Sequence, residues 1–209
     1  MADVVASQLT RQDKREVVFY RAGIALATLC LLLAAGTLSL FLYADAPKDI
    51  KFLSKILDKH FLEKLYLGHF VNFAGAVGLS MIFMHLYART TLKVMQAIYG
   101  VGLITFLAIS SFFTTGLWVL ASHAGLGLVL VAFSFIAAKE AYCFKYYEGW
   151  LVGPLSAVFL YTHVFKLWVP AKYELFTVLA LGVVMLLLTI RKMFQSYADD
   201  IGDKSGYEG

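Results

Sequence analysis

The stretch that decides the fold is VMQAIYGVGLITFLAISSFFTTGLWVLASHAGLGLVLVAFSFIAA, residues 94–138. These 45 residues contain no Asp, Glu, Lys or Arg. An apolar run of more than about 18 residues predicts a membrane-spanning helix, because that length crosses the hydrocarbon layer. The run is long enough for two such helices, with a turn expected at SHAG, residues 122–125. We therefore predict an all-α fold, a polytopic transmembrane helical bundle.

Composition supports a membrane protein and excludes several other classes. Of the 209 residues, 60% are hydrophobic and only 15% are charged, whereas a soluble domain carries about 25% charged residues. The net charge of +4 is typical of loops that face the cytoplasm and anionic lipid. The lipid bilayer is therefore an expected partner, and nucleic acid is not.

Further apolar stretches raise the number of predicted spans to six. Tyr and Trp residues stand at most of their ends, as expected for side chains that favour the headgroup layer. The segments expected outside this domain are a polar cytoplasmic N-terminus, residues 1–19, and a polar tail, residues 196–209, which is flexible unless a partner or the cytoplasmic face holds it. The six-helix domain itself is expected over residues 20–195, with spans at Ala22–Tyr43, Leu67–Tyr87, Val94–Leu120, Leu126–Phe144, Trp150–Val169 and Leu175–Ile190.

A patterned loop precedes the second span. In residues 48–64, apolar side chains recur at helical spacing between lysines and acidic residues, which predicts an amphipathic helix lying in the membrane interface. A cap packed on the spans or on a partner is the alternative interpretation.

The distribution of Lys and Arg predicts the orientation. With the N-terminus in the cytoplasm, eleven of the 18 basic residues lie on the cytoplasmic side and seven lie on the other. Cytoplasmic loops carry the excess of basic residues in membrane proteins. We therefore expect both termini in the cytoplasm or stroma, in a plasma or thylakoid membrane.

Adjacent opposite charges, Lys139 and Glu140, end the fourth predicted span. A carboxylate at a helix C-terminus opposes the helix dipole, so Glu140 is expected to have a basic partner such as Arg21, Arg89 or Lys93. One interpretation is an ion pair that locks helix ends at the interface. The other is a proton or ligand site, because ionisable groups within spans are often functional.

Histidines on several predicted spans form the second candidate site. Neutral imidazoles from different helices can bind a metal, haem iron or chlorophyll magnesium, although a histidine near a helix end is more often a hydrogen-bonded structural residue. Asn72 and the polar run 110–115 could instead contribute to a transport pathway. The candidate ligand-binding residues are His69, His163, His123 and Asn72; the spacing of these residues identifies no particular metal or cofactor.

Enzymatic chemistry has little support in the sequence. The predicted spans hold no paired carboxylates of the kind that acid–base or two-metal chemistry needs. Gly78 and Ser80 stand in a Gly-x-Ser arrangement, but this short pattern is too common to indicate a nucleophile. A non-enzymatic role is therefore favoured.

Three short segments carry a resemblance to a known family. They are REVVFYRAG (residues 15–23), KEAYCF (residues 139–144) and DDIGDKS (residues 199–205). Together they resemble an uncharacterised integral membrane protein family, domain of unknown function 2301, found largely in cyanobacteria and other phototrophs. The resemblance covers about Arg15 to Ser205. It implies a multi-span fold and a phototroph setting, and it implies no reaction or ligand set.

The resembling segments would all meet on the cytoplasmic side. We therefore hypothesise one charged cluster that holds helix ends together or serves as a docking face. Its members would be Arg21, Lys139, Glu140, Asp200 and Asp203.

The expected function follows from spans rich in packing residues and poor in reactive ones. We expect an auxiliary, assembly or scaffold component of a membrane complex, a photosynthetic one included, with a membrane-protein partner. The alternatives are a small-solute or ion transporter, and a haem-, pigment- or metal-binding membrane protein.

Overall fold

The computed structural model describes residues 10–44, 59–86, 88–112, 117–165 and 168–201. Within these ranges the chain is helical and contains no strand. The predicted all-α class is confirmed. The helices are α2 (Arg11–Ala44), α4 (Lys59–Phe83), α5 (Arg89–Phe112), α6 (Leu117–Phe144), α7 (Gly149–Val164), α8 (Ala171–Met193) and α9 (Tyr197–Ile201).

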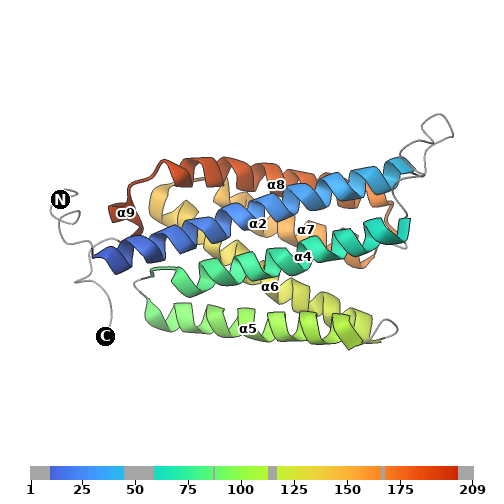
Figure 1. Cartoon of the computed structure of the whole chain (residues 1–209), viewed down its shortest axis with the longest axis horizontal. Helices are drawn as coiled ribbons and strands as arrows, with labels where there is room; N and C mark the ends of the chain where they lie inside the picture. Colours follow the sequence, from blue (N-terminus) through green and yellow to red (C-terminus); the bar gives the residue numbers. More distant parts are fainter. Residues whose placement is uncertain (1–9, 45–58, 87, 113–116, 166–167, 202–209) are drawn as a thin grey trace.

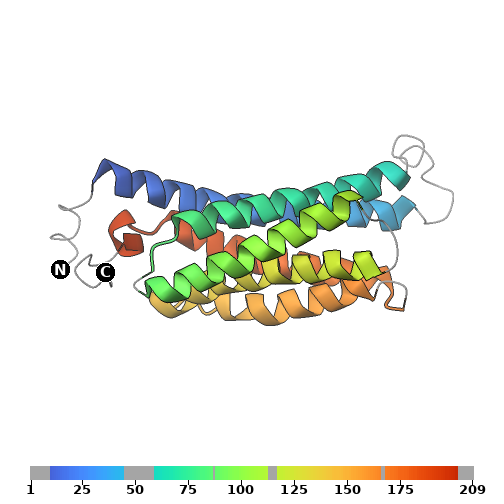
Figure 2. The same cartoon turned by 90° about the horizontal axis from the view of Figure 1, so that it is seen from below.

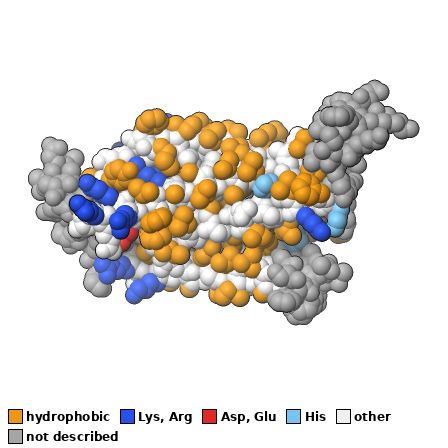
Figure 3. Space-filling view, in the orientation of Figure 1, with side chains coloured by type: hydrophobic (Ala, Val, Ile, Leu, Met, Phe, Trp, Pro, Cys, Tyr) orange, Lys and Arg blue, Asp and Glu red, His pale blue; other side chains and the backbone are white. Residues whose placement is uncertain are grey.

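Five of these helices are long and apolar enough to cross a membrane: α2, α4, α5, α6 and α8. Helix α7 is apolar but has only 16 residues, which at 1.5 Å per residue is shorter than the hydrocarbon layer. Large hydrophobic side chains also remain on the surface, such as Ile104 at 70% and Phe176 at 72% exposure. Figure 3 shows orange hydrophobic side chains covering the middle of one face, with Lys and Arg chiefly at one end. Lipid would cover such a surface.

The chain runs up and down along the long axis of the bundle (Figures 1 and 2). Helix α2 packs between α4 and α8, while α6 packs between α5 and α7. The starts of α2 and α7, the ends of α6 and α8, and helix α9 lie at one end, which we call the α9 end (Figure 1). The ends of α2 and α7 and the starts of α4, α6 and α8 lie at the opposite end, which we call the far end.

The prediction of a turn at residues 122–125 is wrong, because α6 begins at Leu117 and continues through these residues. Gly125 is instead a site of close helix packing. A Cβ atom at Gly125 would lie 2.5 Å from the backbone nitrogen of Phe106, and one at Gly102 would lie 3.0 Å from the Gly125 carbonyl oxygen. Both glycines therefore let the backbones of α5 and α6 approach each other.

Other predicted boundaries also move. The segment PAKYE, residues 170–174, predicts a turn from sequence, but helix α8 begins inside it at Ala171, and Pro170 precedes the first turn of the helix. The third and fifth spans end earlier than predicted, at Phe112 and Val164. Most of the predicted amphipathic helix lies outside the described residues, and residues 59–64 form the start of α4. The polar run 110–115 lies outside the described side chains.

Candidate functional site

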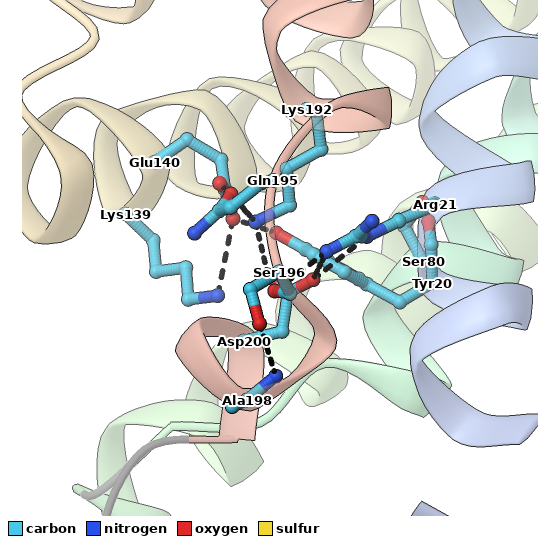
Figure 4. Close-up of polar contacts among 10 residues, drawn as sticks. All are labelled: Tyr20, Arg21, Ser80, Lys139, Glu140, Lys192, Gln195, Ser196, Ala198 and Asp200. Atoms are coloured by element: carbon cyan, nitrogen blue, oxygen red, sulfur yellow. Dashed lines mark hydrogen bonds and ion pairs between the residues drawn. The ribbon is translucent and has the colours of Figure 1, made fainter. Parts of the chain in front are cut away.

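A buried group of charged side chains occupies the α9 end. Figure 4 shows side chains from α2, α6, α8 and α9 pointing toward one another there. We call five of these residues the ionic cluster: Arg21, Lys139, Glu140, Lys192 and Asp200. Each of them has at most 7% of its surface exposed, so they are charged groups in a low-dielectric site.

Lys192 is the centre of the ionic cluster. Its Nζ donates to Oε2 of Glu140 at 2.5 Å, to Oε1 of Gln195 at 2.9 Å, and to Oδ1 of Asp200. The side chain is completely buried. Sequence reasoning missed this role and counted Lys192 only among the basic residues of the cytoplasmic side. The position of Lys192 along α8 could have indicated its burial, because this residue continues the buried stripe formed by Val178, Leu181, Met185 and Leu188.

Glu140 accepts hydrogen bonds from three side chains. Oε1 accepts from Lys139 Nζ at 3.0 Å and from the Tyr20 hydroxyl at 2.5 Å, and Oε2 accepts from Lys192. No ion pair joins Glu140 to Arg21, Arg89 or Lys93 in the part of the chain that the structure describes. The basic partners therefore come from the neighbouring residue and from α8.

Arg21 fastens α9 to the bundle. Its Nε and Nη2 both donate to Oδ2 of Asp200, at 2.8 and 2.6 Å, and Nη2 also donates to the Ser196 carbonyl oxygen at 2.9 Å. The guanidinium carbon lies 4.8 Å from the ring centroid of Tyr197. The first residues of the predicted tail are thus held in place. Asp203, also expected here, lies outside the described residues.

The ionic cluster has three cations and two carboxylates, a net charge of +1. Burial lowers the pKa of the nearby His85, although its Nε2 lies 3.2 Å from Oε2 of Glu16. Breaking a buried ion pair leaves an uncompensated charge and is strongly destabilising. With its groups buried and bonded to one another, the ionic cluster is suited to fastening helix ends.

A cavity of about 540 Å³ lies at the far end. Its apolar wall includes Phe41, Phe70, Phe106 and Leu126. The polar wall comes from five helices, and its members are Thr37, Glu63, Tyr66, Ser122, His123, His163 and Glu174. An apolar cavity with a few convergent polar groups is the usual form of a small-molecule site.

Glu174 organises the polar side of this cavity. Its Oε1 lies 2.5 Å from Nδ1 of His163 and accepts a hydrogen bond from the Tyr66 hydroxyl at 2.8 Å. The Glu174 side chain is 5% exposed and that of His163 is 15% exposed. The contact orients the imidazole across the gap between α7 and α8. Glu174 was not among the predicted site residues, because it was assigned to a turn.

The four residues proposed from sequence for ligand binding do not all meet. His123 and His163 lie with ring centroids 5.1 Å apart and both line the cavity. His69 bonds through Nε2 to the Thr37 hydroxyl at 3.0 Å, and Asn72 is exposed on the surface of α4. Among the residues that the structure describes, no group of three or more His, Cys, Asp or Glu could hold a metal ion.

Comparison with known proteins identifies the family of the chain. No curated protein and no solved structure matches it. A family model described as "Uncharacterized integral membrane protein (DUF2301)" matches residues 79–208. The matched region includes the segments at residues 139–144 and 199–205 but not the one at residues 15–23. Because the match covers more than half of the chain, this integral membrane protein belongs to the DUF2301 family.

Proposed function

We propose that this protein binds a small membrane-soluble molecule in the far-end cavity, without catalysing a reaction on it. The observation that carries the proposal is the cavity of about 540 Å³, in which the Glu174–His163 pair shares the lining with Phe41, Phe70, Phe106 and Leu126. A ligand with an apolar body and a polar head group would match both parts of this lining.

Packing below the cavity favours binding over transport. Phe70 lines the cavity, and its ring centroid lies 5.4 Å from that of Phe159. One turn further along α4, Phe73 packs against Phe133 at 4.9 Å. Each of these four rings is at most 1% exposed, so together they fill the space between the cavity and the ionic cluster. A transported solute would have to displace them.

The orientation of the protein is part of the proposal. We place the α9 end in the cytoplasm and the far end at the opposite membrane surface. This orientation is supported by the excess of Lys and Arg on the side of the N-terminus. Figure 3 agrees with it, since the basic side chains of that face gather chiefly at the α9 end.

A second candidate function is that of an assembly or scaffold component of a membrane complex. The observation that favours it is the attachment of α9, where Ala198, Asp200 and Ile201 are buried against the bundle. A docking face needs a fixed arrangement of its parts, and the ionic cluster provides one. Co-purification of a stoichiometric partner, lost when Asp200 is replaced, would support this candidate.

The ligand proposal is tested by filling the cavity. Ala171 lines it, so Ala171→Trp places a large ring inside, whereas Ala157→Trp puts the same ring on the exposed side of α7. The protein is purified from native membranes in lipid nanodiscs, and its organic extract is analysed by mass spectrometry. We expect the wild type and Ala157→Trp to carry the same stoichiometric non-phospholipid molecule, and Ala171→Trp to lack it. A wild type without such a molecule, or its retention in Ala171→Trp, would contradict the proposal.

A further inference from the structure

The polar wall of the cavity is poorly suited to an anionic head group. Among the described residues that line it there is no Lys or Arg. A phosphate or carboxylate head group would therefore lack the charge-assisted hydrogen bonds that such anions require. Two carboxylates, Glu63 and Glu174, line the cavity, and Oε1 of Glu174 already contacts His163 and Tyr66.

The orientation of His163 leaves one hydrogen-bonding position for a ligand. A carboxylate only accepts hydrogen bonds, so Nδ1 carries the ring proton where it meets Glu174. In a neutral imidazole the second nitrogen, Nε2, is then an acceptor. Nε2 has no hydrogen-bond partner within the described ranges, and His163 lines the cavity. This position calls for a ligand that donates an O–H.

Aromatic side chains surround this acceptor. The ring centroids of Phe70 and Phe159 lie 5.7 and 5.6 Å from that of His163. Phe41 and Phe106 line the cavity as well. Aromatic rings prefer offset-stacked or edge-to-face contacts at such separations, so a flat aromatic body fits this wall better than a flexible chain does.

We infer that the cavity binds a hydroxylated aromatic ring of the phenol or quinol class, with its O–H donating to Nε2 of His163. This inference rests on the proposed function and names the ligand class of the same site. The site lies at helix ends, where membrane proteins meet the headgroup layer. An apolar tail on the ring would extend from there into lipid. Glu174 and Tyr66 are positioning residues, because they orient the imidazole rather than contact the ring.

The test uses four probes of equal alkyl chain length: a decyl-substituted benzoquinol, its dimethyl ether, the matching quinone, and an aliphatic alcohol. Binding to protein in nanodiscs is measured by calorimetry against empty nanodiscs. The ether keeps the ring and removes both O–H donors. We expect the wild type to bind the quinol at least ten times more tightly than the ether, the quinone or the alcohol, because the ether and the quinone lack an O–H donor and the alcohol lacks the ring.

Histidine variants test whether His163 is the residue that accepts the hydrogen bond from the ligand. His163→Gln is expected to lose the preference for quinol over ether. His85→Gln, the same substitution at a histidine near the ionic cluster that contacts Glu16, is expected to keep it. Equal binding of quinol and ether by the wild type overturns the inference even if His163→Gln fails to fold, and so does an unchanged preference in a folded His163→Gln protein.

The outcomes also separate this inference from the proposed function. If neither ring compound binds while the purified protein carries another small molecule that Ala171→Trp loses, the ligand class is wrong and the binding function stands. If the wild type carries no such molecule and binds none of the four probes, both are wrong.

Discussion

Replacing Glu140 with Gln is expected to lower the free energy of unfolding by about 3–5 kcal/mol, the usual cost of breaking a buried ion pair. Glu140 is completely buried and accepts from Lys139, Lys192 and Tyr20. The change raises the net charge of the ionic cluster from +1 to +2. It also turns an amide N–H₂ group, which only donates, toward side chains that already donate. The measurement is reversible unfolding in mixed detergent micelles.

Glu148→Gln is the matched control. Glu148 also lies at the α9 end and pairs with a basic residue, Arg191, but that partner is 56% exposed. Exposed pairs contribute at most about 1 kcal/mol. Equal losses in the two variants would show that burial of the ionic cluster does not determine its energetics.

Removing the positive charge of Lys192 provides a comparison with removing the negative charge of Glu140. Lys192→Met brings the net charge of the ionic cluster to zero, and each carboxylate keeps one basic partner, Lys139 for Glu140 and Arg21 for Asp200. Lys192→Met should therefore cost less than Glu140→Gln, although both remove one buried charge.

Asp200→Asn is expected to release α9 from the bundle. Asp200 accepts from Arg21 and Lys192, and its side chain is 1% exposed. Losing about 3 kcal/mol of this interaction would raise the population in which α9 is detached from the bundle by about a hundredfold, since each 1.4 kcal/mol is a factor of ten. The readout is the thiol-labelling rate of Ala198→Cys, at a position that is 6% exposed, in protein from which Cys30 and Cys143 have been removed.

Asp199→Asn is the control for this release. Asp199 is the preceding residue and is exposed, so its replacement removes the same charge from α9 without touching Arg21 or Lys192. Labelling of Ala198→Cys should stay slow in this variant. If Asp200→Asn leaves the labelling rate as slow as Asp199→Asn does, the ionic cluster does not hold α9.

The membrane class of the fold and part of the ionic cluster were predictable from local sequence. Long runs of apolar residues form helices in lipid, because the backbone N–H and C=O groups there must hydrogen-bond within their own segment. The adjacency of Lys139 and Glu140 at the end of an apolar run is also unusual enough to indicate a special site. In the structure Lys192 links Glu140 to Asp200, and Asp200 pairs with Arg21.

The remaining features depend on contacts between distant segments. The role of Lys192 was missed because its partners, Glu140 and Asp200, come from other helices. Gly125 resembled a turn residue because its packing against Phe106 on α5 is visible only in three dimensions. Glu174 was assigned to a turn, although it lies in the first turn of α8 and bonds Tyr66 on α4. Sequence periodicity shows which side of a helix is buried, but not which side chain it meets.

The central claim is that the ionic cluster and the cavity lie at opposite surfaces of the membrane. Single cysteines at Gln12, Lys172 and Asp199, all exposed positions, test it in a background without Cys30 and Cys143. A membrane-impermeant maleimide applied to intact cells should label Lys172→Cys. It should label Gln12→Cys and Asp199→Cys only after the membrane is opened. Labelling of Lys172→Cys from the same side as either of the other two would contradict the account.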